Sequence, residues 1–317
     1  MVKRINGYGI FDESEFGAYE SAKISNGSVE ARVCVAVFEN PFYCGTRFDW
    51  SGAIFSLKYK GREFFGKWLP SPHISSNHDC ISGPVDEFSQ IGYDDAQIGG
   101  IFLKIGAGAL FRDAEPYNFR KTYKIADAGI RKISLSANSA EFVHELDCGK
   151  FSYAYAKRIT LAENSPRMTI EHILKNRSSE PIETLVYNHN FFTLDKKRTS
   201  NGVSVSVPFE LRGEIVAGIP EFAQIDAKTI RIAREIPDEK FALVKNMESP
   251  KTAQSYDITV RRESDGLFGA RITSDKPLEK LTFWTCPTAV CPEPFTKISV
   301  PAGGEFGWNL HYDFFAL

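Results

Sequence analysis

The sequence is dominated by short runs in which apolar and polar residues alternate, and a helical period is almost absent. Apolar side chains at every second position place one face of a strand toward a core. Such runs begin at Val29, continue through Ala53–Tyr59 and recur up to Phe315, with turn-rich links between them. Repeated strands joined by short turns are typical of antiparallel sheets. The sequence therefore predicts a large all-β sandwich, and no shift in composition divides residues 1–317 into more than one domain.

The most regular alternation lies in the middle of the chain. Strands are predicted over Tyr117–Ile125, Ile130–Ala137, Ala140–Leu146, Phe151–Leu161, Met168–Lys175 and Thr184–Leu194. The links between them are short, as in an antiparallel meander.

One polar segment, Leu69–Tyr93, interrupts this pattern with several prolines, serines and carboxylates. Long loops inside compact domains are uncommon and often functional. Because the segment holds His73 and His78, it is a candidate binding loop, although a solvated loop fits most of its residues equally well.

Glycines are also concentrated on either side of the apolar run that starts at Ile101. Gly99, Gly100, Gly106 and Gly108 predict bulges or a close approach of the backbone to another group. A phosphate cradle is the alternative, but no helical pattern follows these glycines to supply the N-terminus that such a cradle uses.

Charge and cysteine content exclude several classes of function. The 38 basic and 40 acidic residues give a net charge of -2, which supplies no field to gather nucleic acid or anionic lipid. The N-terminal stretch Met1–Gly7 lacks the apolar core of a secretion signal, so a cytoplasmic protein is expected. The six cysteines are scattered, which favours reduced core thiols over a disulfide frame or a cysteine metal site.

His189 is the histidine whose context best suits proton transfer. It follows a strand-like run, lies between Asn188 and Asn190, and precedes two phenylalanines that could exclude water. The remaining strand histidines, His144, His172 and His311, fit structural or surface positions. From its context alone, His189 is as well explained by a structural role as by a functional one.

Glu293 is the second candidate, because it lies between Pro292 and Pro294 among apolar residues. Two prolines stiffen the backbone, and apolar neighbours raise the pKa of a carboxyl group by desolvation. A general base near neutral pH needs these properties. An exposed carboxylate in a proline-rich turn fits the same pattern.

Two motifs resemble those of the galactose mutarotases, or aldose 1-epimerases, and of the related hexose-6-phosphate 1-epimerases. Asn188–Leu194 is similar to their Asn-His-Thr-Tyr-Phe-Asn-Leu motif, and Val290–Pro294 resembles their Cys-x-Glu-Pro segment. The stretch Met168–Asn176 and the C-terminal Pro301, Gly303 and Tyr312 agree in order and approximate spacing.

The resemblance implies a β-supersandwich that exchanges protons on a cyclic sugar, without metal or organic cofactor. Glu293 would take the proton of the anomeric hydroxyl while His189, as imidazolium, protonates the ring oxygen. An anionic Glu293 is expected to raise the pKa of His189. The two groups should face one pocket from opposite sides of a space the size of a sugar ring.

The substrate-binding residues of the family have no clear counterparts, because its second histidine and its arginine occur in motifs that this chain lacks. The nearest candidates are Arg47, Trp50, His78, Asn188 and Asp257. Arg47 could bond sugar hydroxyls or form a structural salt bridge, and Trp50 could stack on a sugar ring.

Two alternatives remain open. A hexose-6-phosphate 1-epimerase would need basic groups beside His189, for which Arg47, Arg112, Arg120 and Lys121 are candidates. A carbohydrate-binding or regulatory protein could keep the cleft without turnover. The sequence does not predict the oligomeric state.

Overall fold

The computed structural model describes residues 19–37, 40–69, 73–264 and 266–317. Within these ranges nearly every regular element is an antiparallel strand, which confirms the predicted β-sandwich. The helical elements there are two single turns, η1 (Leu194–Lys196) and η2 (Ala253–Ser255). No helix of the described ranges is long and apolar enough to cross a membrane. The first residues of the chain, including Met1–Gly7, lie outside the described part.

The larger sheet has ten strands in the order β16-β17-β14-β19-β20-β23-β12-β11-β10-β9. In chain order they are β9 (Ile130–Leu135), β10 (Ser139–Cys148), β11 (Phe151–Leu161), β12 (Arg167–Asn176), β14 (Val203–Ser206), β16 (Ala223–Asp226), β17 (Thr229–Ile232), β19 (Asp257–Arg262), β20 (Phe268–Ser274) and β23 (Glu305–Ala316).

The second sheet has six strands in the order β15-β18-β21-β22-β13-β5. They are β5 (Val85–Phe88), β13 (Ile182–His189), β15 (Glu214–Ala217), β18 (Ala242–Glu248), β21 (Lys280–Thr285) and β22 (Val290–Val300). Two small sheets complete the fold: β1 (Ser21–Ser25), β2 (Val29–Cys34), β3 (Ile54–Tyr59) and β4 (Arg62–Glu63), and β6 (Ile101–Lys104), β7 (Gly108–Phe111) and β8 (Ile125–Asp127).

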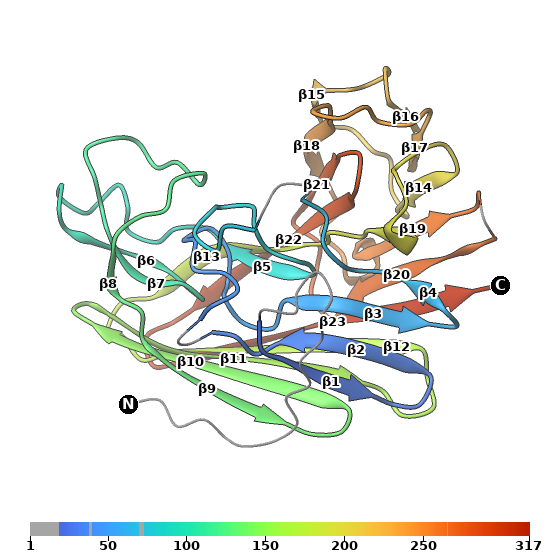
Figure 1. Ribbon diagram of the computed structural model, residues 1–317. Coiled ribbons are helices and arrows are strands. Elements are labelled where there is room, and N and C mark those ends of the chain that lie inside the picture. The colour runs from blue at the N-terminus through green and yellow to red at the C-terminus, as the bar shows by residue number, and fades with distance from the viewer. Residues whose placement is uncertain (1–18, 38–39, 70–72, 265) are drawn as a thin grey trace.

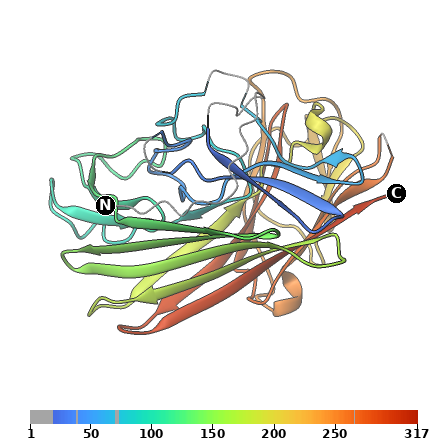
Figure 2. The same cartoon turned by 60° about the horizontal axis from the view of Figure 1, so that its bottom comes forward.

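The two large sheets form the layers of the sandwich. In Figure 1 the long strands β9–β12 and β23 lie below β5, β13 and β22, with β6–β8 at the left of the upper layer. Figure 2 brings these long lower strands to the front, where they run side by side. Apolar residues such as Val244, Ile258 and Phe283 belong to the main core cluster and are fully buried. Alternation along each strand therefore directs one face inward, as the sequence predicts.

A cluster of charged side chains is buried between the layers, below β5 and β13. Lys157 of the ten-stranded sheet places Nζ 2.8 Å from Oδ2 of Asp86 in β5 and 3.4 Å from Oδ2 of Asp49. His172 and Tyr155 also contact the Asp86 carboxylate, each at 3.2 Å. Burying charges is costly unless each has partners, and here every carboxylate faces a cation. The cluster joins the two sheets at one point.

The prediction of a loop over Leu69–Tyr93 is wrong in part, because Val85–Phe88 forms the buried strand β5. The strand could not be recognised in the sequence, because the polar residues Asp86 and Glu87 interrupt its apolar pattern. Both carboxylates are buried since they meet charged partners on opposite faces of the sheet. Residues 70–72 of the same segment lie outside the described part of the chain.

The glycines around β6 confirm the predicted close approach of backbones. Gly106 has φ +84°, and a Cβ at this position would lie 2.6 Å from the Cβ of Asp49. Only a residue without a side chain fits here. The six cysteines are free thiols, as expected.

Candidate active site

His189 and Glu293 meet because β13 and β22 are antiparallel neighbours. Their ladder pairs Tyr187 with Phe295, and two further residues along this register His189 faces Glu293. Nε2 of His189 lies 3.2 Å from Oε1 of Glu293. The prolines that flank Glu293 therefore belong to a strand, which excludes the exposed proline-rich turn. Proline cannot donate to a ladder, and the β13–β22 pairing ends just before Pro294.

His189 is enclosed by aromatic rings. Its imidazole stacks on Phe191 at 3.8 Å between centroids, while Phe48 and Trp284 approach edge-on at 5.7 and 5.9 Å. The side chain is nearly buried, and its Nδ1 finds no hydrogen-bond partner among the described residues. The expected exclusion of water by phenylalanines is therefore met by Phe191 and by Phe48 from another segment.

Gly83 supports the backbone of this site. A Cβ on Gly83 would lie 2.6 Å from the carbonyl oxygen of His189 and 2.7 Å from the amide nitrogen of Phe191. Real Cβ atoms do not approach backbone this closely. The end of β13 can occupy its place only because residue 83 is glycine.

Burial moves the proton of the pair toward the carboxyl group. The pKa of Glu293 is raised to about 8, chiefly by desolvation, with the charge of Arg47 lowering it and the carboxylates of Glu87 and Asp79 raising it. Desolvation, and then the charge of Arg47, lowers the pKa of His189 well below its usual 6.5. The expectation that Glu293 would raise the pKa of His189 is wrong, because neither group is solvated enough to carry its charge.

The pair meets one geometric expectation and departs from another. Both side chains lie on the same face of the six-stranded sheet, since they are neighbours across two strands. They also touch directly, so the predicted space the size of a sugar ring does not separate them.

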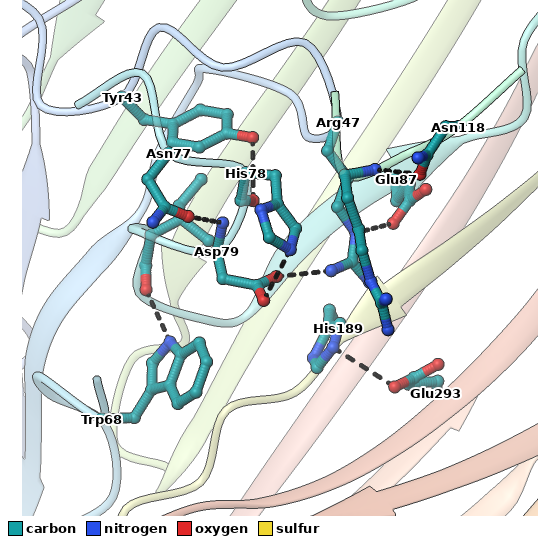
Figure 3. Close-up of polar contacts among 12 residues, drawn as sticks. Tyr43, Arg47, Trp68, Asn77, His78, Asp79, Glu87, Asn118, His189 and Glu293 are labelled. Carbon is teal, nitrogen blue, oxygen red and sulfur yellow. Dashed lines mark hydrogen bonds and ion pairs between the residues drawn. The ribbon is translucent and has the colours of Figure 1, made fainter. Parts of the chain in front are cut away.

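Arg47 lies beside the pair and is held by three acceptors (Figure 3). Its Nε donates to Oε2 of Glu87 at 2.6 Å, Nη1 to Oδ1 of Asp79 at 2.5 Å, and Nη2 to the hydroxyl of Tyr187 at 3.0 Å. We call Asp79, Arg47 and Glu87 the carboxylate clamp. Arg47 therefore forms the structural salt bridges that were the alternative to sugar binding, and it forms them beside His189 and Glu293.

His78 is connected to the clamp. Its Nε2 lies 2.9 Å from Oδ2 of Asp79, and its ring meets the exposed ring of Phe119 edge-on at 6.2 Å. Burial by itself raises the pKa of Asp79, but the hydrogen bond from His78 and the charge of Arg47 outweigh it, and the net pKa lies below the ordinary value. His78 is therefore near the pair, as expected of a substrate-binding candidate, and reaches it through Asp79 and Arg47.

Three other candidates, Trp50, Asn188 and Asp257, have their partners away from the pair. The indole of Trp50 is buried, donates to the carbonyl of Gly45, and has the guanidinium of Arg131 4.6 Å from its ring centroid. The predicted stacking of Trp50 on a sugar ring is therefore not seen in an open position, because the ring is buried and contacts Arg131.

Asn188 points to the side of β13 opposite His189, where it donates to Oδ1 of Asp86 at 3.1 Å and accepts from Tyr312. It belongs to the buried polar cluster. Asp257 lies on the outer face of the ten-stranded sheet, since its neighbour Ile258 is buried in the core, and it binds both Nε and Nη2 of Arg271. Strand alternation turns both side chains away from the pair, so the structure does not bring them together with His189 and Glu293.

The four basic candidates do not gather beside His189. Only Arg47 contributes to its electrostatic surroundings. The other three have partners elsewhere: Arg112 donates to the carbonyls of Asp94 and Ala96, Lys121 pairs with Asp113, and Arg120 lies over the ring of Phe119 at 5.4 Å. The cluster expected of a site for sugar phosphates is not formed by these residues.

The other histidines are held in structural contacts. His73 stacks on Phe42 at 4.4 Å and lies 2.6 Å from its carbonyl oxygen, His144 contacts Tyr153 and Ala128, and His311 contacts Thr169. His172 lies in the buried cluster with Asp86. Across the described ranges, no group of three or more His, Cys, Asp or Glu residues is arranged to hold a metal ion.

Sequence reasoning missed the carboxylates Asp79 and Glu87 and the hydroxyl of Tyr187. A signal was present, because the polar segment before Tyr93 is rich in carboxylates. It could not be used, since nothing in the segment indicates which carboxylate faces Arg47.

The sequence matches no protein-family model and no curated protein. Solved structures are nevertheless similar over nearly the whole chain. A galactose mutarotase-like protein from Clostridium acetobutylicum shares 12% identity at a TM-score of 0.56, covering 94% of this chain and 96% of the other. For a galactose mutarotase-like protein from Lactobacillus casei the values are 12%, 0.55, 93% and 100%.

An aldose epimerase homologue from C. elegans is 12% identical at a TM-score of 0.52, with 94% of this chain and 99% of that chain covered. At such identities the likeness establishes the fold. The chain has the galactose mutarotase-like fold, as the motifs around His189 and Glu293 predict.

Proposed function

We propose that the chain is an aldose 1-epimerase-like isomerase that interconverts the α and β anomers of a hexose or a related sugar. The observation that supports the proposal is that His189 and Glu293 are cross-strand neighbours on one face of the six-stranded sheet, in a buried setting with aromatic rings around His189. The two groups match an acid/base pair in chemistry and in position on one sheet face.

The reaction needs the pair to carry one transferable proton. With Glu293 protonated and His189 neutral, transfer of the proton from Oε1 of Glu293 to Nε2 of His189, 3.2 Å away, produces the carboxylate and the imidazolium. Glu293 then takes the proton of the anomeric hydroxyl while His189 gives its proton to the ring oxygen, and the bond from C1 to the ring oxygen breaks. Rotation about C1–C2 and closure on the other face return both protons. No electron is gained or lost.

A sugar would reach the pair from the side of the sheet where Arg47 and Tyr187 lie, and it would displace the direct contact as it binds. Polar hydroxyls brought into the site favour the charged form of the pair, because they replace part of the lost solvation.

A carbohydrate-binding protein without turnover is the second candidate. The direct contact between the two groups favours it, since a binding protein needs no gap between His189 and Glu293. The hexose-6-phosphate reading has less support, because Arg112 and Lys121 are engaged elsewhere.

The test is anomer exchange, followed by magnetisation-transfer NMR on a panel of neutral aldoses and their 6-phosphates. The proposal expects faster exchange for at least one sugar with the wild-type chain and background exchange with Glu293→Gln. Binding without faster exchange, seen by saturation-transfer difference NMR, would support the binding protein instead. We further propose a small-molecule sugar as the partner and the cytoplasm as the location, in keeping with the charge of the chain.

A further inference from the structure

The carboxylate clamp holds one cation rigidly beside the proposed acid/base pair. Arg47 donates hydrogen bonds from Nε to Glu87, from Nη1 to Asp79 and from Nη2 to Tyr187. Only 11% of the side-chain surface of Arg47 is exposed, as for Glu87, against 31% for Asp79. A guanidinium held by three acceptors in a fork has little freedom to turn toward another group.

Two aromatic rings also lie close to the same guanidinium. Its central carbon lies 4.4 Å from the ring centroid of Phe48 and 4.5 Å from that of Phe119. The ring of Phe48 in turn meets His189 edge-on. Phe48 therefore contacts both Arg47 and His189, and Figure 3 shows Arg47 bonded to Asp79 and Glu87 on the side of the site above His189 and Glu293.

The clamp contains one cation and two anions, and its members act on the pair in opposite directions. Arg47 lowers the pKa of both His189 and Glu293, whereas Glu87 and Asp79 raise that of Glu293, all in addition to the larger effect of burial. Among the described residues, the titratable and charged groups that act on the pair or on the clamp include Arg47, Tyr43, His78, Asp79, Glu87, Lys104, Tyr117, Tyr187, Lys245 and Cys291.

The charged groups outside the clamp have smaller electrostatic effects on His189 and Glu293. Lys104 is buried, donates to the carbonyl of Phe88 and lies 3.8 Å from Oε1 of Glu87, so it acts on the clamp first. Lys245 is exposed, and water screens its charge. Burial raises the pKa of the Cys291 thiol well above its usual range, which keeps it neutral.

We propose that Asp79 and Glu87 are positioning residues, which hold Arg47 beside His189 and Glu293 and, through the balance of these three charges, set the pH range in which the pair carries its single proton. The link to catalysis rests on the proposed function. The effect of the three charges on the titration of Glu293 is a property of the protein without substrate.

The charges predict shifts of opposite sign. Asp79→Asn or Glu87→Gln removes an anion, so the carboxylate form of Glu293 becomes less costly and its titration midpoint falls. Arg47→Met removes the cation, so the midpoint rises. Changes of about one pH unit are expected for a charge at this range in a buried site. A purely structural role for the clamp would lower stability without opposed shifts.

The experiment is a ¹³C NMR titration of the protein labelled at glutamate side-chain carboxyls, with the Glu293 signal assigned by its loss in Glu293→Gln. The wild-type chain is compared with Asp79→Asn, Glu87→Gln and Arg47→Met. Asp313→Asn serves as the matched control, because Asp313 pairs with Arg167 in an exposed position. Thermal melts establish that each variant is folded.

Lower midpoints in both carboxylate variants and a higher one in Arg47→Met are expected, with no change in the control. Unchanged midpoints, or shifts of the same sign in all three variants, would overturn the proposal. If Arg47→Met does not fold, the carboxylate variants decide alone, since both must lower the midpoint. No turnover is needed, so failure of the isomerase assignment would leave this titration intact, and the reverse also holds.

Discussion

Asp86 and Glu87 are consecutive residues of β5, and their carboxylates lie on opposite faces of one sheet. Asp86 faces the interior and contacts Lys157 at 2.8 Å, while Glu87 faces the site and accepts from Arg47 at 2.6 Å. Strand alternation makes this division unavoidable. A single short strand therefore joins the buried charge cluster between the sheets to the carboxylate clamp beside His189.

Asp86→Asn should destabilise the fold strongly. The change leaves Lys157 without its closest anion in a site where neither side chain is exposed beyond 1%. Breaking a buried pair in this way costs about 3–5 kcal/mol. Urea unfolding followed by tryptophan fluorescence measures the loss. Asp313→Asn breaks an exposed pair with Arg167 and should cost about 0–1 kcal/mol. Equal losses in the two variants would contradict the cluster's role in stability.

Glu293→Gln and His189→Asn should each reduce anomer exchange by about 10²–10⁴-fold, the usual contribution of a positioned acid or base. Both changes preserve approximate shape and remove proton transfer. NMR exchange rates on the most active sugar provide the measurement. Glu305→Gln is the control, because Glu305 forms an exposed pair with Lys175 on the outer sheet. Wild-type rates in the two site variants would remove the acid/base assignment.

The pH profile of kcat/KM should be bell-shaped. The pair loses its single proton as pH rises through the pKa of Glu293, at about 8, and gains a second as pH falls through the lowered pKa of His189. Activity is thus expected to fall above about pH 8 and, on the acid side, only well below the ordinary histidine value of 6.5. Rates measured in overlapping buffers of constant ionic strength test this. An acid limb at or above pH 6.5 would contradict the burial of a neutral His189.

Gly83→Ala should impair the site more than an alanine elsewhere in the sandwich. Its Cβ would meet the backbone of His189 and Phe191 at distances that require the strand end to move. A displacement of this kind separates His189 from Glu293, so kcat should fall together with stability. Gly303→Ala has open space around its Cβ and tests the general cost of replacing a glycine, although its φ of +71° adds local strain. Full activity in Gly83→Ala would mean that the chain relaxes around the methyl group without disturbing the pair.

The sandwich was predictable because its strands alternate clearly. The neighbouring positions of His189 and Glu293 were predictable because two short motifs resemble those of a known family. Strand β5 could not be predicted, because a polar sequence forms a buried strand only when cations from distant segments face it. The clamp depends on contacts between residues 32 and 40 positions apart, which no local pattern encodes. The outward orientation of Asp257 could not be predicted, because it is decided by one step of register beside the buried Ile258.

His189 and Glu293 come from β13 and β22 of one sheet, whereas Arg47, Asp79 and Phe119 come from connecting segments earlier in the chain. The contact within the pair depends on strand register, and the surroundings depend on loops, which tolerate change far better than strands. The strands that hold the pair and the loops that surround it can therefore vary independently. For the proposed isomerase, replacing residues 40–50, 73–81 or 113–122 with segments of other sequence is therefore expected to change the sugar preference while the proposed acid/base pair stays in place.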